Sequence, residues 1–194
     1  EVGHLNIGAG RIVYQDLAII NIACKDNSIA EMENLKASFN YAKQHNKALH
    51  FIGLVSDGGI HSHKNHLYKL CELANKAGVK NVFVHAFTDG RDCDPKSGKG
   101  FIQELEQNLF GAKIASICGR YYAMDRDKRW ERIKLAYDLL TKGKGESSKN
   151  LEVSIQNSYD NGVTDEFIKP IIFVDENGNP VAKIQEDDAV ICFN

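Results

Sequence analysis

The chain has 194 residues, with 24 Lys and Arg against 26 Asp and Glu, so its formal net charge is −2 when its 7 histidines are neutral. A chain of this length forms one domain or one large part of a bigger protein, and it needs no disulfide or metal to build a core. A hydrophobic content of 43% argues against disorder, and the near-neutral charge argues against a general nucleic-acid binder. No apolar run approaches the roughly 20 residues that a membrane-spanning helix needs.

Cysteine usage indicates the compartment. The 5 cysteines are odd in number and widely spaced, and no C-x-x-C pair occurs among Cys24, Cys71, Cys93, Cys118 and Cys192. This usage predicts reduced thiols in a cytoplasmic protein. Because the chain starts at Glu1 rather than Met and finishes on a strand-like pattern, we expect further polypeptide on both sides.

The first predicted element is a helix that follows a capping box. Ser28 and Glu31 have the spacing of this signature. The apolar residues that follow on one helical face are Met32, Leu35, Phe39 and Ala42. Short apolar runs then occur at 50–55, 82–87 and 113–118. Such runs are typical of parallel strands that are covered on both faces.

Helical stripes separate these strands. The second helix has its apolar stripe at Leu67, Leu70, Cys71, Ala74 and Ala77, with Gly78 at its C-terminus. The third helix is indicated by Phe101, Leu105 and Leu109, and the fourth, which ends at Gly143, by Trp130, Ile133, Tyr137 and Leu140. Alternating strands and helices predict an α/β layered domain with a largely parallel central sheet flanked by helices.

The last third of the chain is predicted to complete the sheet. Residues 143–150 have the composition of a loop. Apolar runs at 171–174 and 189–193 are separated by a turn at 177–180. We expect these runs to add strands, some of them antiparallel, so that the central sheet is mixed.

Polar loops follow the first three predicted strands. They cover residues 56–63, 88–92 and 119–126. In open α/β sheets ligands bind beyond the carboxyl ends of the strands. Arg91, Arg120, Arg126 and His61 are expected to converge there on a small, highly anionic ligand such as a phosphorylated organic acid, because arginine forks match carboxylate and phosphate oxygens. Asp92, between these cations, is expected to stay ionised, bind a ligand hydroxyl and accept its proton.

Simpler structural roles compete with this interpretation. An arginine after a strand is often solvated, and Arg91 could merely brace its loop. Asp57 and Asp89 could cap helices or turns. The cations of the fourth helix are interpreted as a solvated face, namely Lys128, Arg129, Arg132 and Lys134. The same character in three loops favours a ligand site.

Closely spaced histidines give an alternative hypothesis, a stand-alone metal-dependent hydrolase. His61, His63 and His66, with Asp57 nearby, could share a metal ion. His63 and His66 fall at a predicted helix start, where their rings diverge, and the spacing offers no further ligand. We therefore predict no metal site in this chain. The other histidines are expected to be isolated and structural, namely His4, His45, His50 and His85.

Long motifs at 1–11, 56–63, 89–92 and 119–126 closely resemble cofactor-independent phosphoglycerate mutases, and the resemblance runs along essentially the whole chain. It implies a two-domain enzyme, in which a metal-binding, phosphatase-like domain holds two manganese ions and a nucleophilic serine. An inserted α/β domain holds the substrate. By this resemblance residues 1–27 are a linker from the phosphatase-like domain and residues 28–194 are the substrate-binding domain. The family's serine and metal ligands have no counterpart in this sequence.

Five residues match the family's substrate-binding positions: His61, Arg91, Asp92, Arg120 and Arg126. The resemblance implies interconversion of 3-phosphoglycerate and 2-phosphoglycerate through a phosphoserine. The arginines would hold carboxylate or phosphate oxygens, His61 would contact the phosphate, and Asp92 would act as the catalytic proton shuttle. We expect the chain alone to be inactive and to need the phosphatase-like domain of the same polypeptide. A non-catalytic module that binds acidic metabolites is the remaining alternative.

Overall fold

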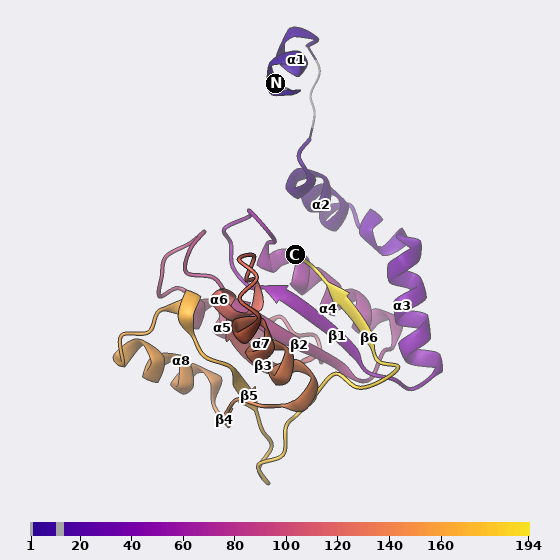
Figure 1. Cartoon of the computed structure of the whole chain (residues 1–194). Helices are drawn as coiled ribbons and strands as arrows, with labels where there is room; N and C mark the ends of the chain where they lie inside the picture. The colour runs from indigo at the N-terminus through magenta and orange to yellow at the C-terminus, as the bar shows by residue number, and fades with distance from the viewer. Residues whose placement is uncertain (1, 11–13) are drawn as a thin grey trace.

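The computed structural model describes residues 2–10 and 14–194 of the chain. Two helices come first, α1 (Val2–Gly8) and α2 (Asp16–Lys25), and Figure 1 shows α1 standing away from the sheet. A short 3-10 helix, η1 (Ser28–Glu31), follows α2. Within the described residues, no helix combines the length and apolar character that a bilayer crossing demands.

Six strands form one sheet in the order β4-β5-β3-β2-β1-β6. Their bounds are β1 Leu49–Leu54, β2 Val82–Thr88, β3 Lys113–Gly119, β4 Glu146–Ser148, β5 Ile171–Phe173 and β6 Ala189–Cys192. β1 is parallel to β2 and β6, β2 to β3, and β4 to β5, whereas β3 and β5 are antiparallel. The prediction of a mixed, largely parallel sheet is confirmed.

Helices cover both faces of this sheet (Figure 1). The larger core lies on one face and includes residues of α3 (Glu33–Gln44), α4 (Lys64–Ala77), α5 (Gly98–Gln107) and α8 (Leu151–Asp160). The smaller core lies on the other face, under α6 (Arg120–Ala123) and α7 (Trp130–Lys142). Alternate strand residues enter each core, Phe51 and Val84 the larger, Leu54 and Phe87 the smaller.

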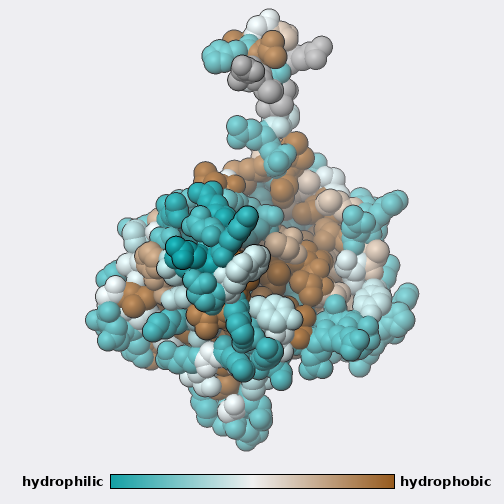
Figure 2. All heavy atoms as spheres, viewed as in Figure 1, coloured by the Kyte–Doolittle hydropathy of each residue, from teal (hydrophilic) through white to brown (hydrophobic). Residues whose placement is uncertain are grey.

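Hydrophilic and hydrophobic side chains occupy different areas of the surface (Figure 2). Hydrophilic side chains gather over the loops at the carboxyl ends of the strands, beside α6, while an apolar area extends over β1 and β6. The carboxyl edge of the sheet is therefore the polar edge, as expected for the ligand site of an open α/β sheet.

Glycines end two of the predicted helices as expected. Gly78 follows α4 with φ of 79°, and Gly143 follows α7 with φ of 67°, a left-handed conformation that favours glycine. The capping-box prediction is wrong. Ser28 lies in η1, and its backbone N–H donates to Asp26 Oδ1 at 2.8 Å. The Asp26 carboxylate caps this short turn, and α3 begins later, after Met32.

The predicted apolar face of α7 is partly wrong: Leu140 packs against the smaller core and Ile133 is half-buried, but the two aromatic residues of the stripe are exposed. Trp130 is 70% exposed and Tyr137 is 58% exposed, whereas Ala136 and Leu139 are buried. The fully buried residues, Ala136 and Leu139, lie on a neighbouring stripe of the helix, beside Leu140. The large aromatic side chains dominated the sequence pattern, but the small Ala136 allows α7 to lie close on the sheet.

Two elements near residue 150 were not predicted. The expected loop at 143–150 contains β4, whose first N–H, that of Glu146, donates to Pro170 O at 2.9 Å. This strand is short and polar and lies at the sheet edge, so it has no apolar pattern to reveal it. Helix α8 follows, and the Asn150 side chain caps it by accepting from Val153 N at 3.0 Å.

Two of the histidines expected to be isolated are joined across the sheet. His50 Nδ1 lies 3.0 Å from His85 Nε2, and His50 Nε2 lies 3.2 Å from Asp188 Oδ2. His85 Nδ1 lies 2.7 Å from Ser116 Oγ. Burial lowers the pKa of both rings, that of His85 to about 3, so both are neutral and structural at pH 7.

Candidate functional site

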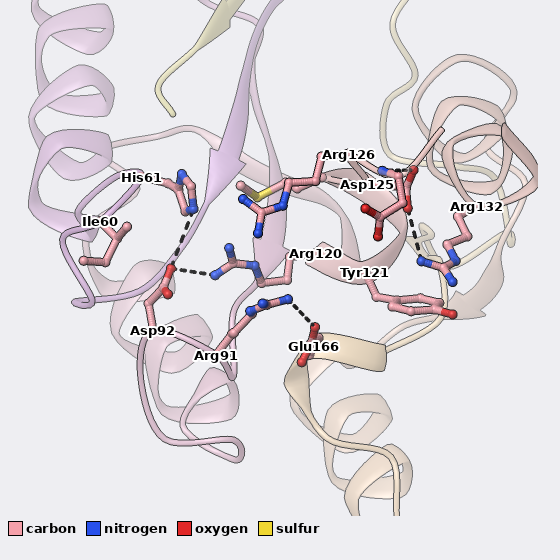
Figure 3. A pocket seen from close by; sticks show the side chains of 12 residues that line it. Ile60, His61, Arg91, Asp92, Arg120, Tyr121, Asp125, Arg126, Arg132 and Glu166 are labelled. Atoms are coloured by element: carbon pink, nitrogen blue, oxygen red, sulfur yellow. Dashed lines mark hydrogen bonds and ion pairs between the residues drawn. The ribbon is translucent and has the colours of Figure 1, made fainter. Parts of the chain in front are cut away.

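A pocket of about 350 Å³ lies at the carboxyl ends of β1, β2 and β3. It is lined by Ile60, His61, Arg91, Asp92, Arg120, Tyr121, Met124, Asp125, Arg126, Asp127, Arg132 and Glu166. Figure 3 shows the guanidinium groups of Arg91, Arg120 and Arg126 around a common space. The structure thus brings all five sequence-predicted site residues to one pocket. Their role in binding a ligand stays a prediction.

Arg120 is fixed between two carboxylates. It is the first residue of α6, directly after β3, and its Nη1 donates to Asp89 Oδ1 at 2.7 Å and to Asp92 Oδ2 at 2.6 Å. Its side chain is only 10% exposed. Burial acts to lower the pKa of this guanidinium, but pairing with both carboxylates outweighs burial and raises the pKa. Arg120 is therefore a permanently charged group in a preset orientation.

Asp89 is the buried anchor of the loop after β2. Its carboxylate is 1% exposed and accepts from Ser56 Oγ at 2.6 Å, from Arg91 N at 3.1 Å and from Asp92 N at 3.0 Å. Burial acts to raise the pKa of Asp89, but these hydrogen bonds and the one from Arg120 outweigh burial and lower it. The turn-cap interpretation of Asp89 is confirmed, and the ion pair with Arg120 adds to it.

Asp92 links the loops after β1, β2 and β3. Its Oδ2 accepts from Arg120 and lies 3.9 Å from His61 Nε2. A Cβ on Gly58 would stand 2.8 Å from Asp92 Cβ, so the His61 loop passes close to Asp92 only because residue 58 is glycine. Asp92 Oδ1 accepts no hydrogen bond from the residues that the structure describes, which leaves it available for a ligand hydroxyl.

The other two predicted arginines are held less firmly. The Arg91 side chain is 58% exposed, and its Nη1 lies 3.5 Å from Glu166 Oε1. Arg126 makes no ion pair within residues 2–10 and 14–194. Figure 3 shows both guanidinium groups facing the pocket. Arg91 and Arg126 are therefore the cations most available to an incoming anion.

Arg132 was interpreted as part of a solvated helix face, and this is wrong. Its Nη1 donates to Asp125 Oδ1 at 3.1 Å, and its guanidinium carbon lies 3.9 Å from the centre of the Tyr121 ring. The other Asp125 oxygen accepts from two backbone N–H groups, those of Asp127 and Arg129. Asp125 thereby holds the loop that carries Arg126, and Arg132 closes one side of the pocket.

The formal charges of the acidic and arginine side chains that line the pocket balance one another. Four of its lining residues are arginines, and four carry carboxylates, namely Asp92, Asp125, Asp127 and Glu166. An anionic ligand must therefore exploit unpaired cations or displace a carboxylate from its partner.

Glu166 was not predicted as a site residue. It lies in the 3-10 helix η2 (Asp165–Phe167), which packs on the ends of two strands: Thr88 Oγ1 donates to Asp165 O at 2.7 Å, and Gly119 N donates to Ile168 O at 2.8 Å. Glu166 is 75 residues from Arg91 in the sequence. No local pattern could reveal this contact, because η2 follows no strand.

The histidines of the metal-hydrolase hypothesis do not form a common site. His66 Nε2 lies 2.7 Å from Asn21 Oδ1, and His63 Nδ1 accepts from Asn65 N at 3.2 Å. His61 lies in the pocket beside Asp92 instead. Among residues 2–10 and 14–194, no three His, Cys, Asp or Glu side chains are grouped to hold a metal ion. That alternative is wrong for the described residues.

Comparisons with known proteins identify the family. The model of the BPG-independent PGAM N-terminus (iPGM_N) matches residues 20–194. The chain is 63% identical to the 2,3-bisphosphoglycerate-independent phosphoglycerate mutase of Parabacteroides distasonis and 52% identical to that of Clostridium beijerinckii, and covers 38% of each protein. Crystal structures of Leishmania mexicana phosphoglycerate mutase at low cobalt concentration include a chain with TM-score 0.87 and 35% identity, which matches 95% of this chain and 36% of its own. With a family model that matches almost its full length, the chain belongs to the N-terminal domain family of the 2,3-bisphosphoglycerate-independent phosphoglycerate mutases.

Proposed function

We propose that this chain holds the substrate while the whole protein interconverts 3-phosphoglycerate and 2-phosphoglycerate. The observation that carries the proposal is the convergence of three arginines with His61 and Asp92 on one pocket, in a chain of this family. The chain spans 38–39% of the length of the curated relatives that it matches, so the reaction of the whole protein is proposed here.

The chemistry of the pocket fits the groups of a phosphoglycerate. Arg91 and Arg126 present guanidinium groups for carboxylate or phosphate oxygens, and His61 stands beside them for the phosphate. Asp92 Oδ1 can accept from a substrate hydroxyl while Oδ2 stays on Arg120. Arg120 therefore acts through Asp92, which it orients toward the substrate.

Asp92 is also the proposed catalytic residue. Each half of the interconversion requires a glycerate hydroxyl to gain or lose a proton as the phosphoryl group moves. Asp92 would take and return that proton at its Oδ1, while the arginines keep the glycerate in place between the two transfers. Such catalysis consists mainly of positioning and charge stabilisation, which a pocket rich in arginine supplies.

The remaining parts of the proposal concern the division of the chain into segments and the second domain of the whole protein. Residues 1–27 are proposed as a linker and 28–194 as the substrate-binding domain, with the nucleophilic serine and two Mn²⁺ ions in a phosphatase-like domain. The described residues offer no group of three metal ligands, so they do not fit the metal. The proposed location is the cytoplasm, in agreement with five free thiols.

Binding of 3-phosphoglycerate to the chain, followed by NMR titration, tests the proposal. Arg126→Ala should raise the Kd about tenfold, since a charge-assisted hydrogen bond contributes roughly 1.5–3 kcal/mol. Lys80→Ala is the matched control, because Lys80 is an exposed cation just before β2, at the amino ends of the strands and so opposite the pocket. An equal Kd for R126A and K80A would refute the proposed site. Turnover that appears only when the rest of the polypeptide is added would support the enzyme, and its absence would favour a non-catalytic module.

A further inference from the structure

We infer that Glu166 is an internal counter-anion, which occupies Arg91 in the free protein and is displaced from it by the anionic group of the substrate. The inference rests on the proposed function, since it concerns the affinity of the same pocket. Glu166 would thus lower the affinity of the pocket for the substrate.

The backbone position of Glu166 is fixed by both neighbouring loops. A Cβ on Gly90 would stand 2.9 Å from Glu166 N, and a Cβ on Gly119 would press against the Glu166 carbonyl oxygen. Gly90 precedes Arg91, and Gly119 precedes Arg120. Because η2 is packed this tightly against both arginine loops, its carboxylate stays beside the pocket when Arg91 moves.

Arg91 is bound only weakly to Glu166, so a ligand can separate the two side chains. Its one ion pair is long, 3.5 Å, and its side chain is 58% exposed. Arg120, by contrast, has two contacts at 2.6 and 2.7 Å and is 10% exposed. An exposed single pair contributes little to stability. A ligand can therefore take Arg91 from Glu166 at small cost, whereas Arg120 stays with Asp89 and Asp92.

The balance of charge in the pocket explains why the transfer of Arg91 from Glu166 to the ligand would matter for binding. Four arginines and four carboxylates line the pocket, and of these four arginines Arg126 is the one that has no ion pair with the residues that the structure describes. A ligand bound by Arg126 alone would have a single strong cation. Release of Arg91 from Glu166 provides the second, and the tendency of the Arg91–Glu166 pair to form again favours release of the product.

The test is a double-mutant cycle on 3-phosphoglycerate binding to the full 194-residue chain. Glu166→Gln keeps the shape and removes the charge, and it should lower the Kd about two- to fivefold, the range expected for one exposed ion pair. Arg91→Ala should raise the Kd, and in that background E166Q should have an effect of less than about 1.5-fold. Glu176→Gln is the control, because Glu176 has the same chemistry, is 96% exposed and does not line the pocket.

The outcomes separate this inference from the proposed function. Tightening by E166Q that depends on Arg91, with no change in E176Q, supports the inference. A Kd that is unchanged or higher in E166Q while R91A and R126A both weaken binding overturns the inference and leaves the proposed site standing. Equal tightening with and without Arg91 also overturns the inference, since Glu166 would then act by electrostatic repulsion of the ligand and not by competition for Arg91. A Kd unaffected by R91A and R126A overturns the proposed site as well. Equal thermal midpoints of E166Q and the unmodified chain exclude an effect through folding.

Discussion

Removal of the Asp89 charge should destabilise the whole carboxyl edge of the sheet. Asp89→Asn keeps the size of the side chain, but its amide cannot compensate the guanidinium of Arg120, which donates to Asp89 Oδ1 at 2.7 Å. Breaking a buried ion pair by removing one partner costs about 3–5 kcal/mol. Arg120 keeps its 2.6 Å contact with Asp92, so we expect the lower end, about 3 kcal/mol of the free energy of unfolding.

The pH dependence of this loss follows from the pKa of Asp89. Hydrogen bonds hold that pKa below 3.8 in the folded chain, so the carboxylate binds fewer protons than in the unfolded chain. Its contribution is fully present well above pH 3.8 and is lost as the pH falls through the folded pKa. The difference between D89N and the unmodified chain should therefore be largest near neutral pH and shrink below about pH 4.

Urea unfolding followed by circular dichroism measures both effects. Asp187→Asn is the matched control, because the Asp187 side chain is 65% exposed and has a single 3.5 Å contact with Lys47, so its loss should be below about 0.5 kcal/mol. A D89N variant within about 0.5 kcal/mol of the unmodified chain at pH 7 would refute the assignment of Asp89 as the anchor of this loop.

Two further predictions concern stability. Gly119→Ala should cost about 1–3 kcal/mol in thermal unfolding, because its Cβ would meet the backbone of η2 at Glu166 C, 2.8 Å away, and the next residue at Ile168 N, also 2.8 Å away. Gly100→Ala, in α5 with nothing within 4 Å, should be neutral or stabilising, and equal midpoints for the two variants would contradict the reasoning. The pKa of His85 is lowered to about 3 in the folded chain, so below pH 6.5 this side chain binds more protons in the unfolded chain than in the folded chain. The free energy of unfolding should therefore fall by about 2 kcal/mol between pH 7.5 and pH 5 because of His85. His85→Gln should flatten this slope in urea unfolding, and an unchanged slope would show that His85 becomes protonated without unfolding.

Much of the fold was predictable because buried parallel strands leave a strong mark on a sequence. The runs that contain Phe51, Val84 and Ile114 are apolar, since helices cover both faces of the sheet. Edge strands carry no such mark, so β4 was missed. The face of α7 was misjudged because helical spacing fits more than one stripe, and only packing on the sheet selects the stripe with Ala136.

The site was predictable to the extent that it is local to strand ends. Arg91 and Arg120 lie within three residues of the ends of β2 and β3, Arg126 follows in the loop after α6, and parallel strands bring their carboxyl ends to one side of the sheet. Glu166 and Arg132 reach the pocket from other elements, through contacts that only the tertiary structure creates. The carboxylates that neutralise the arginines were therefore underestimated, and so was the need for a ligand to compete with them.

The four residues from Asp89 to Asp92 show why the order of this motif matters. Asp89 turns inward and binds the N–H groups of the next two polar residues, so the loop folds around its carboxylate. Gly90 has φ of 68° and packs against η2, where a Cβ would stand 2.8 Å from Asp165 Cβ. Arg91 and Asp92 then face the pocket, and their backbone is held in place by the contacts of Asp89 and Gly90. An exchange of Asp89 with Asp92 would keep the composition but would put the loop anchor in the pocket and a ligand group in the core.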